Sequence, residues 1–270
     1  MIMVTGASGQ LASLTLKELN AGGQAVVGGT RSPEGGMRHL DFDSPDTLDL
    51  RGVATLVLTS AGYAEDDQVV ARHQAVVEAA VRDNVSHIVY TSLTGAGDHL
   101  GFALAHRATE RLVKASGLGW TILRNGLYAE LFGGLLTWGP DGIESAFGGG
   151  AVSAVARADL AVAAAVVAAA PTEHEGKTYE LVGDTAITVK DVADRLGVGH
   201  RSISMAQYRA RLLAVDTLLP FQPSMLSSIA TSVRHGFLNA SKSDLPRLLR
   251  RPALDSLTVA SDTIASSRPR

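Results

Sequence analysis

The chain has 270 residues, of which 46% are hydrophobic and 19% charged, and its formal net charge at pH 7 is −3. This length allows one large domain or a domain with an added lobe, and the slightly acidic balance gives no electrostatic footprint for nucleic acid. The sequence contains no cysteine, which excludes disulfides, thiol catalysis and thiolate metal ligands.

The first twelve residues, Met1–Ala12, have the pattern of a strand, a glycine turn and the start of a helix. An apolar run precedes Gly6 and Gly9, and a helical pattern then continues to Gly22. Gly6 allows a sharp turn, and Gly9 lacks the Cβ that would block a pyrophosphate facing the N–H groups at the helix start. The segment predicts a dinucleotide site, the alternative being a tight turn without a ligand. Because no basic segment precedes the strand, we expect no secretory signal.

The second predicted strand, Gln24–Gly29, is followed by Arg31. Enzymes that use NAD usually carry an acidic residue here for the ribose hydroxyls, whereas a guanidinium can pair with the 2′-phosphate of NADP. The sequence therefore favours NADPH over NADH, the alternative being a solvated surface arginine. A short third strand, Met37–Phe42, precedes Asp43. This aspartate either reaches the adenine amino group or caps a helix over Pro45–Leu50.

Three more predicted strands alternate with two helices in the next part of the chain. This alternation predicts a Rossmann-type, doubly wound α/β fold with a parallel sheet in the order 3-2-1-4-5-6. The strands are expected over residues 54–59, 85–91 and 119–123, and the helices over residues 66–83 and 102–116.

Polar residues lie where these strands end, and ligands bind beyond the carboxyl ends of the strands in such sheets. The residues that we expect at this edge near the cofactor are Thr59, Ser60 and Ala61 after the fourth strand, with Tyr63 beside them, and Thr91 at the end of the fifth. Asn125 and Tyr128 follow the sixth strand and either bind a substrate carbonyl or serve the geometry of the turn.

The usual acid of short-chain dehydrogenases is missing. These enzymes use a Tyr-x-x-x-Lys pair, in which the lysine lowers the pKa of the tyrosine that protonates the alkoxide, and no tyrosine here has a lysine four residues later. The equivalent helix start offers His106 and Glu110, which can share a face. We interpret His106 as a donor or positioning group beside the nicotinamide, the alternative being a pair on the helix surface.

The missing acid also constrains the substrate. Ketone reduction produces a strongly basic alkoxide, whereas quinone reduction produces a phenolate whose charge is delocalised into a ring. Solvent or a modest donor is then sufficient, so the pattern suits a quinone-like acceptor or no chemistry at all.

The alternation of strands and helices breaks after Asn125. We expect a mobile, glycine-rich loop or lid over residues 132–150, then an alanine-rich helix that Asp159 caps and that is shorter than the roughly 20 residues of a membrane span. A strand over Thr178–Gly183 and a helix over Thr188–Leu196 follow.

The predicted domains are a Rossmann domain and a smaller lobe. The NADP-binding domain comprises residues 1–125, with residues 151–171 packed on it. The smaller C-terminal α/β substrate lobe comprises residues 126–150 and 172–270.

Several stretches resemble the NmrA-like atypical short-chain dehydrogenases, and most closely the bacterial type 2 NAD(P)H:quinone oxidoreductases. The matching stretches are Thr5–Leu11, His87–Leu93, His106–Glu110, Leu123–Tyr128, Arg157–Asp159 and Glu175–Asp184. The chain departs from the family pattern at Leu127, where a tryptophan is common, at Ala12, where a glycine is common, and in a short 126–150 segment. The resemblance implies a dimer, nicotinamide near residues 59–61 and 125–128, and NADPH held by Gly6, Ser8, Gly9, Gln10, Leu11 and Arg31.

Three functions therefore compete. The first is an NADPH-dependent oxidoreductase that passes a hydride to a quinone or similar conjugated carbonyl, with His106, Asn125 and Tyr128 around the acceptor. The second is a redox sensor that binds the dinucleotide without turnover, as some NmrA-like proteins do. The third is an isomerase or reductase of a biosynthetic pathway. In each case we expect a cytoplasmic protein with a small-molecule ligand and no metal, membrane or nucleic-acid partner.

Overall fold

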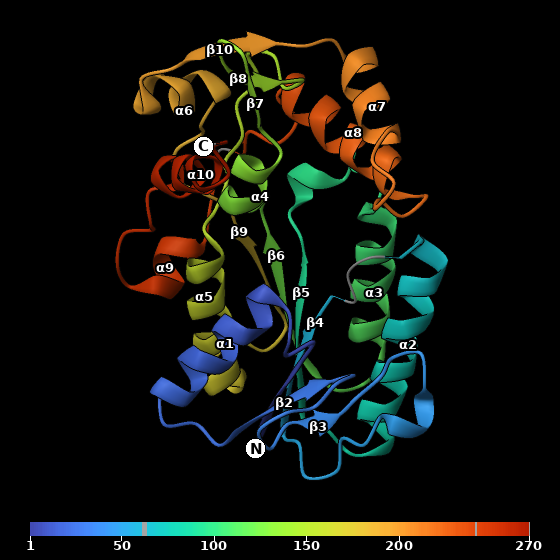
Figure 1. The fold of residues 1–270 in the computed structure, drawn as a ribbon. Helices are drawn as coiled ribbons and strands as arrows, with labels where there is room; N and C mark the ends of the chain where they lie inside the picture. The colour runs from blue at the N-terminus through green and yellow to red at the C-terminus, as the bar shows by residue number, and fades with distance from the viewer. Residues whose placement is uncertain (61–63, 241, 270) are drawn as a thin grey trace.

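The computed structural model of the chain describes residues 1–60, 64–240 and 242–269, and its core is a seven-stranded parallel sheet (Figure 1). The order β3-β2-β1-β4-β5-β6-β9 confirms the predicted order of the first six strands. The strands are β1 (Ile2–Thr5), β2 (Val26–Thr30), β3 (Arg38–His39), β4 (Thr55–Thr59), β5 (His87–Leu93), β6 (Gly119–Asn125) and β9 (Lys177–Leu181).

Strand β9 pairs in parallel with β6 and forms the edge of the large sheet. The sequence predicted that this strand, with the rest of residues 172–270, belongs to the smaller lobe. The alanine-rich helix α5 (Arg157–Ala169) makes the crossover that returns the chain to this edge. We therefore count β9 with the large sheet.

Helices cover both faces of the sheet. Helices α1 (Gln10–Ala21), α5 and α9 (Leu245–Leu249) lie on one face, and α2 (Asp66–Arg82) and α3 (Ala103–Ala115) lie on the other (Figure 1). Alternate side chains of one strand enter different clusters, since Val57 packs toward the α1 and α5 side whereas Leu56 and Leu58 pack toward α2. Because both faces of such a strand are buried, its sequence is a continuous apolar run.

The smaller lobe lies beyond the carboxyl ends of the large sheet and has its own apolar cluster (Figure 1). It contains a three-stranded sheet in the order β10-β8-β7. Its elements are α4 (Ala129–Gly134), β7 (Thr137–Gly139), β8 (Gly142–Ser145), α6 (Val189–Leu196), β10 (Gly199–Ser202), α7 (Met205–Leu213), α8 (Gln222–Arg234) and α10 (Ser256–Ser266).

The expected mobile loop over residues 132–150 is wrong, because α4, β7 and β8 form there. The glycines serve close packing instead of flexibility. A Cβ on Gly142 would collide with the Gly199 carbonyl of the paired strand, and a Cβ on Gly150 would collide with the Val233 carbonyl of α8. Glycine is the residue that permits such close approach of two backbones.

Two other local predictions are wrong. The helix expected over residues 45–50 is one 3₁₀ turn, Pro45–Thr47. Asp159 does not cap α5, whose N-cap is Ala156. Its buried carboxylate instead accepts hydrogen bonds from Arg251 Nη2 at 2.7 Å and from the Leu254 N–H at 2.6 Å, and thereby ties the C-terminal segment to α5. Within the described ranges, the structure offers no helix with the length and apolarity of a membrane span.

Candidate functional site

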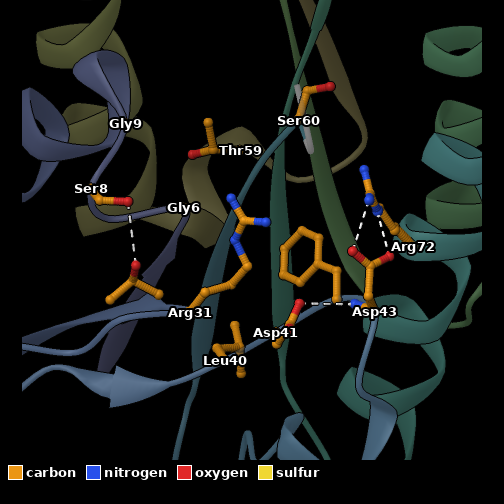
Figure 2. Close-up of a pocket in the computed structure, with 12 residues that line it drawn as sticks. Gly6, Ser8, Gly9, Arg31, Leu40, Asp41, Asp43, Thr59, Ser60 and Arg72 are labelled. Atoms are coloured by element: carbon orange, nitrogen blue, oxygen red, sulfur yellow. Dashed lines mark hydrogen bonds and ion pairs between the residues drawn. The ribbon is translucent and has the colours of Figure 1, made fainter. Parts of the chain in front are cut away.

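Two adjoining cavities follow the carboxyl edge of the large sheet. A cleft of about 300 Å³ lies between the turn after β1, the end of β2 and the start of α2 (Figure 2). A larger pocket of about 660 Å³ lies between β4, β5, β6, α3 and α8. Thr59 and Ser60 line both cavities, so a long ligand can extend from one into the other.

The turn after β1 has the geometry of an anion site. Gly6 has a φ of +64°, a conformation that side chains disfavour, and its carbonyl accepts a hydrogen bond from the Gly9 N–H at 2.7 Å. A Cβ on Gly9 would lie 3.1 Å from that carbonyl. Gly9 is the N-cap of α1, and no side chain of residues 1–60, 64–240 or 242–269 caps the helix. The first N–H groups of α1 and the positive end of its dipole are therefore left for a ligand.

The predicted phosphate-binding residues occupy different environments. Gly6, Ser8 and Gly9 line the cleft, and Ser8 Oγ is held by the Thr30 hydroxyl at 3.3 Å. Gln10 is exposed at the start of α1, outside the cleft lining, and the Leu11 side chain is buried in the core. Leu11 can therefore contribute a backbone N–H but not a side-chain contact.

Four charged residues line the cleft, namely Arg31, Asp41, Asp43 and Arg72. Arg31 is exposed and points into the cleft (Figure 2), and it has no ion pair with any residue in the described part of the chain. Asp43 instead receives two hydrogen bonds from Arg72, Nε to Oδ1 at 2.6 Å and Nη2 to Oδ2 at 2.7 Å. These bonds hold the pKa of Asp43 below its usual value.

Asp43 does not cap the following turn, whose N-cap is Ser44. The capping alternative is therefore wrong, and the adenine contact stays a prediction. Arg72 was missed by the sequence reasoning, because it lies about thirty residues away on α2 and meets Asp43 only through the fold. Its place on an amphipathic helix that carries several other charged residues gave no distinguishing signal.

The segment after β4 is fixed by two threonines on neighbouring strands. Thr5 Oγ1 accepts a hydrogen bond from the Thr59 N–H at 3.0 Å, and Thr91 Oγ1 accepts one from the Ser60 N–H at 3.2 Å. Thr91 also lines the larger pocket. The predicted contacts at Ala61 and Tyr63 lie outside the described residues.

The larger pocket has mainly apolar walls and few polar groups. In the described part of the chain, no lysine or arginine lines it, and its carboxylates are Glu65 and Asp66. Sequence reasoning missed the wall that α8 and the segment before it supply. The apolar lining residues are Val69, Leu93, Phe102, Leu127, Leu131, Pro220, Phe221, Met225, Leu226 and Ile229.

Asn125 and Tyr128 both reach this pocket, as predicted from their place after β6. Asn125 is buried, and its Oδ1 atom has no hydrogen-bond partner among the described residues. A buried acceptor without a partner is costly, so this atom indicates a ligand that brings a donor. The Tyr128 ring packs under the Arg157 guanidinium, 4.5 Å from the ring centroid.

His106 also lines the pocket, half-buried on α3. Its Nδ1 lies 2.9 Å from the hydroxyl of Tyr90, a fully buried residue of β5. Burial, with a smaller contribution from the Arg107 charge, lowers the pKa of His106 to about 4. The imidazole is therefore neutral near pH 7.

The alternative of a surface pair between His106 and Glu110 is wrong. Glu110 is buried, and its carboxylate binds Arg107, Arg124 and the Ser92 hydroxyl at 2.6 to 2.9 Å. His106 and Glu110 lie on the same side of α3, but they form hydrogen bonds with different residues. His73, on helix α2, is buried, and its Nδ1 lies 2.7 Å from the Thr109 hydroxyl of α3.

Comparison with known proteins identifies NAD(P)H-binding reductases as relatives of this chain. A family model described as NAD(P)H-binding matches residues 6–171. Quinone oxidoreductase 2 of Escherichia coli (strain K12) is 32% identical, over 93% of this chain and 94% of that protein. A (4-alkanoyl-5-oxo-2,5-dihydrofuran-3-yl)methyl phosphate reductase of Streptomyces griseus subsp. griseus is 27% identical, over 94% of each chain.

Solved structures show the same similarity. The NADPH-dependent quinone oxidoreductase of E. coli in complex with NADPH has a TM-score of 0.84 and 30% identity, covering 97% of this chain and 99% of that one. Triphenylmethane reductase of Citrobacter sp. in complex with NADP(H) also has a TM-score of 0.84, with 28% identity and 99% coverage of both chains.

Gly9→Asp tests the anion site at the helix start. Aspartate is a good N-cap for α1, which has no side-chain cap, so the free energy of unfolding should stay within about 1 kcal/mol of the wild-type value. The carboxylate would occupy the place of the diphosphate and repel it, so NADPH affinity should fall by about 100-fold or more. Isothermal titration calorimetry and urea denaturation measure the two effects.

Gly149→Asp is the matched control, because Gly149 is exposed, has an ordinary φ and has open space around its Cβ position. It should bind NADPH as the wild type does. Unchanged NADPH affinity in Gly9→Asp would show that the dinucleotide does not bind at this turn.

Proposed function

Since the chain belongs to the NAD(P)H-binding, NmrA-like family of oxidoreductases, we propose that it transfers a hydride from NADPH to a quinone. The observation that carries the proposal is the continuity of the two cavities at Thr59 and Ser60. One cavity offers an anion site and a free arginine. The other offers apolar walls with a neutral donor and an unpaired acceptor.

The residues of the two cavities fit three groups of the dinucleotide, namely the diphosphate, the 2′-phosphate and the nicotinamide. The turn at Gly6 and Gly9 would hold the diphosphate, and Arg31 would pair with the 2′-phosphate. The carboxamide of the nicotinamide carries an N–H₂ group, the kind of donor that the buried Oδ1 of Asn125 lacks. We therefore assign Asn125 to the nicotinamide, near which the family resemblance placed it, whereas its position after β6 left a substrate carbonyl and turn geometry as alternatives.

The larger pocket supports an uncharged, planar acceptor. Its apolar lining would bury the faces of a ring, and without a lysine or arginine among its described lining residues it offers no partner for a phosphate group. This argues against a phosphorylated substrate such as that of the Streptomyces relative. The two carboxylates at the start of α2, Glu65 and Asp66, would favour a cationic conjugated dye as a second acceptor.

The reaction balances without a strong protein acid. When bound, NADPH supplies a hydride, and quinone, hydride and one proton give the hydroquinone. The proton comes from solvent, because the pKa of His106 is too low for it to be protonated near pH 7. His106 would instead donate a hydrogen bond to the acceptor oxygen and stabilise the charge that develops there.

The test of this function is NADPH oxidation followed at 340 nm with 1,4-benzoquinone as acceptor. We expect quinone-dependent oxidation by the wild type and a loss of at least about 100-fold in kcat/KM for NADPH in Gly9→Asp, which cannot hold the diphosphate. A cationic triphenylmethane dye in place of the quinone tests the second acceptor.

Tight NADPH binding without oxidation of NADPH by any of these acceptors would overturn the proposal. That result would favour the sensor alternative, which the reductase relatives do not favour.

Arg31→Ala tests the choice between the two nicotinamide cofactors. Removing a charge-assisted contact to the 2′-phosphate should raise the KM for NADPH by about 10- to 100-fold. The KM for NADH should change by less than about threefold, because NADH lacks this phosphate.

Steady-state kinetics with both cofactors measures this selectivity. Arg51→Met is the control, since Arg51 is an exposed arginine whose partner is Asp49, outside both cavities. Equal losses for NADPH and NADH in Arg31→Ala would show that the arginine does not recognise the 2′-phosphate.

Asn125→Leu tests the assignment of the unpaired acceptor. Leucine has a similar shape and removes a buried polar atom without a partner, so the free protein should unfold at the same or a higher temperature. The rise in melting temperature on adding NADPH should shrink, because about tenfold in affinity is lost with the carboxamide contact.

Ser261→Ala is the matched control, since Ser261 Oγ is also buried without a partner but lies on α10. It should leave the NADPH-induced rise intact. An undiminished rise in Asn125→Leu would contradict the role given to Asn125.

A further inference from the structure

The Tyr90–His106 contact connects the core of the sheet to the larger pocket. Tyr90 is fully buried on β5, and its hydroxyl reaches Nδ1 of His106. His106 lines the pocket, and its Nε2 has no hydrogen-bond partner among the described residues. A neutral imidazole can be a donor at only one of its nitrogens, so the contact at Nδ1 decides what Nε2 presents to a ligand.

The hydrogen atoms of the buried cluster can be assigned in order. The Thr109 hydroxyl donates to the Ala105 carbonyl at 2.8 Å, so it accepts from Nδ1 of His73 at 2.7 Å. Burial keeps the pKa of Tyr90 above its usual value, and Tyr90 is therefore always a hydroxyl that carries one hydrogen. This hydroxyl also lies near the Thr109 and Ser60 side chains, and its contact of 2.9 Å is with Nδ1 of His106, which can accept its hydrogen.

We infer that Tyr90 is a positioning residue that holds neutral His106 in the tautomer with its hydrogen on Nε2. His106 then presents an N–H donor to the oxygen of the acceptor in the pocket. The inference rests on the proposed hydride transfer for its chemical purpose, but the tautomer itself is a property of the free protein. No proton leaves Tyr90 or His106 in the reaction, since the proton of the hydroquinone comes from solvent.

A donor fixed in this way stabilises charge at the acceptor oxygen as the hydride arrives. Without the Tyr90 hydroxyl, the imidazole can place its hydrogen on either nitrogen, and only one of the two forms donates to the acceptor. The loss should appear in kcat and not in the binding of NADPH, because the contact strengthens as negative charge develops.

Tyr90→Phe tests the inference, because it removes the hydroxyl and keeps the ring that packs in the core. We expect kcat with 1,4-benzoquinone to fall about tenfold, the effect of one oriented hydrogen bond, and the KM for NADPH to stay within about twofold. In the His106→Ala background the same change should cost less than about twofold, since the residue on which Tyr90 acts is gone.

Nitrogen-15 NMR of protein labelled at histidine gives a readout that does not depend on turnover. His106→Ala identifies the His106 signals by their absence. In the wild type, Nε2 should carry the hydrogen and Nδ1 should not, and in Tyr90→Phe the two nitrogens should show averaged or mixed protonation.

Tyr179→Phe is the matched control, because the Tyr179 hydroxyl makes the same kind of contact with Nδ1 of His174, at 2.8 Å and outside both cavities. It should leave kcat and the His106 signals unchanged.

The outcomes separate the inference from the proposed function. If the wild type does not reduce quinones, the proposed function fails, and the NMR signals alone decide the inference. A wild-type His106 with its hydrogen on Nδ1, or a Tyr90→Phe variant with the wild-type tautomer and wild-type kcat, would overturn it.

Discussion

The arrangement of both cavities depends on one constraint, which is that a parallel sheet brings the carboxyl ends of its strands to a single edge. The backbone must leave β1 at once and enter α1, and the left-handed conformation of Gly6 makes this turn possible. The helix then begins without a side-chain cap, so its first N–H groups remain available to an anion. Strand β4 ends beside this turn, and β5 and β6 end farther along the same edge, where they line the larger pocket.

Burial determines the chemistry that the site can perform. His106 would be a proton donor if it were charged, but its burial on α3 keeps it neutral. A neutral imidazole suits an acceptor whose charge is delocalised after hydride transfer, and it does not suit a simple ketone. The missing Tyr-x-x-x-Lys pair of the short-chain dehydrogenases and the neutral histidine both support the quinone-type acceptor that we propose.

The smaller lobe completes the pocket through close backbone packing. The glycines for which the sequence predicted a loop let β8 lie close to β10. They also let the segment after Phe147 lie close to α8. Helix α8 can then lie against the edge of the large sheet and form the apolar wall of the pocket. The ion pair between Arg251 and the buried Asp159 adds a fixed contact between the C-terminal segment and helix α5.

The sequence alone determined the first six strands of the large sheet and the glycine turn after β1, because these depend on local patterns, whereas it placed β9 in the smaller lobe. Apolar strands, helix periodicity and the two glycines each act over a few residues, and the order of the first six strands followed from them. Only the tertiary structure decided which distant groups meet. Contacts between separate elements bring Arg72 to Asp43 and Tyr90 to His106. The same packing buries Oδ1 of Asn125 without a hydrogen-bond partner among the described residues. No spacing along the chain records such contacts, since they depend on how helices and strands pack.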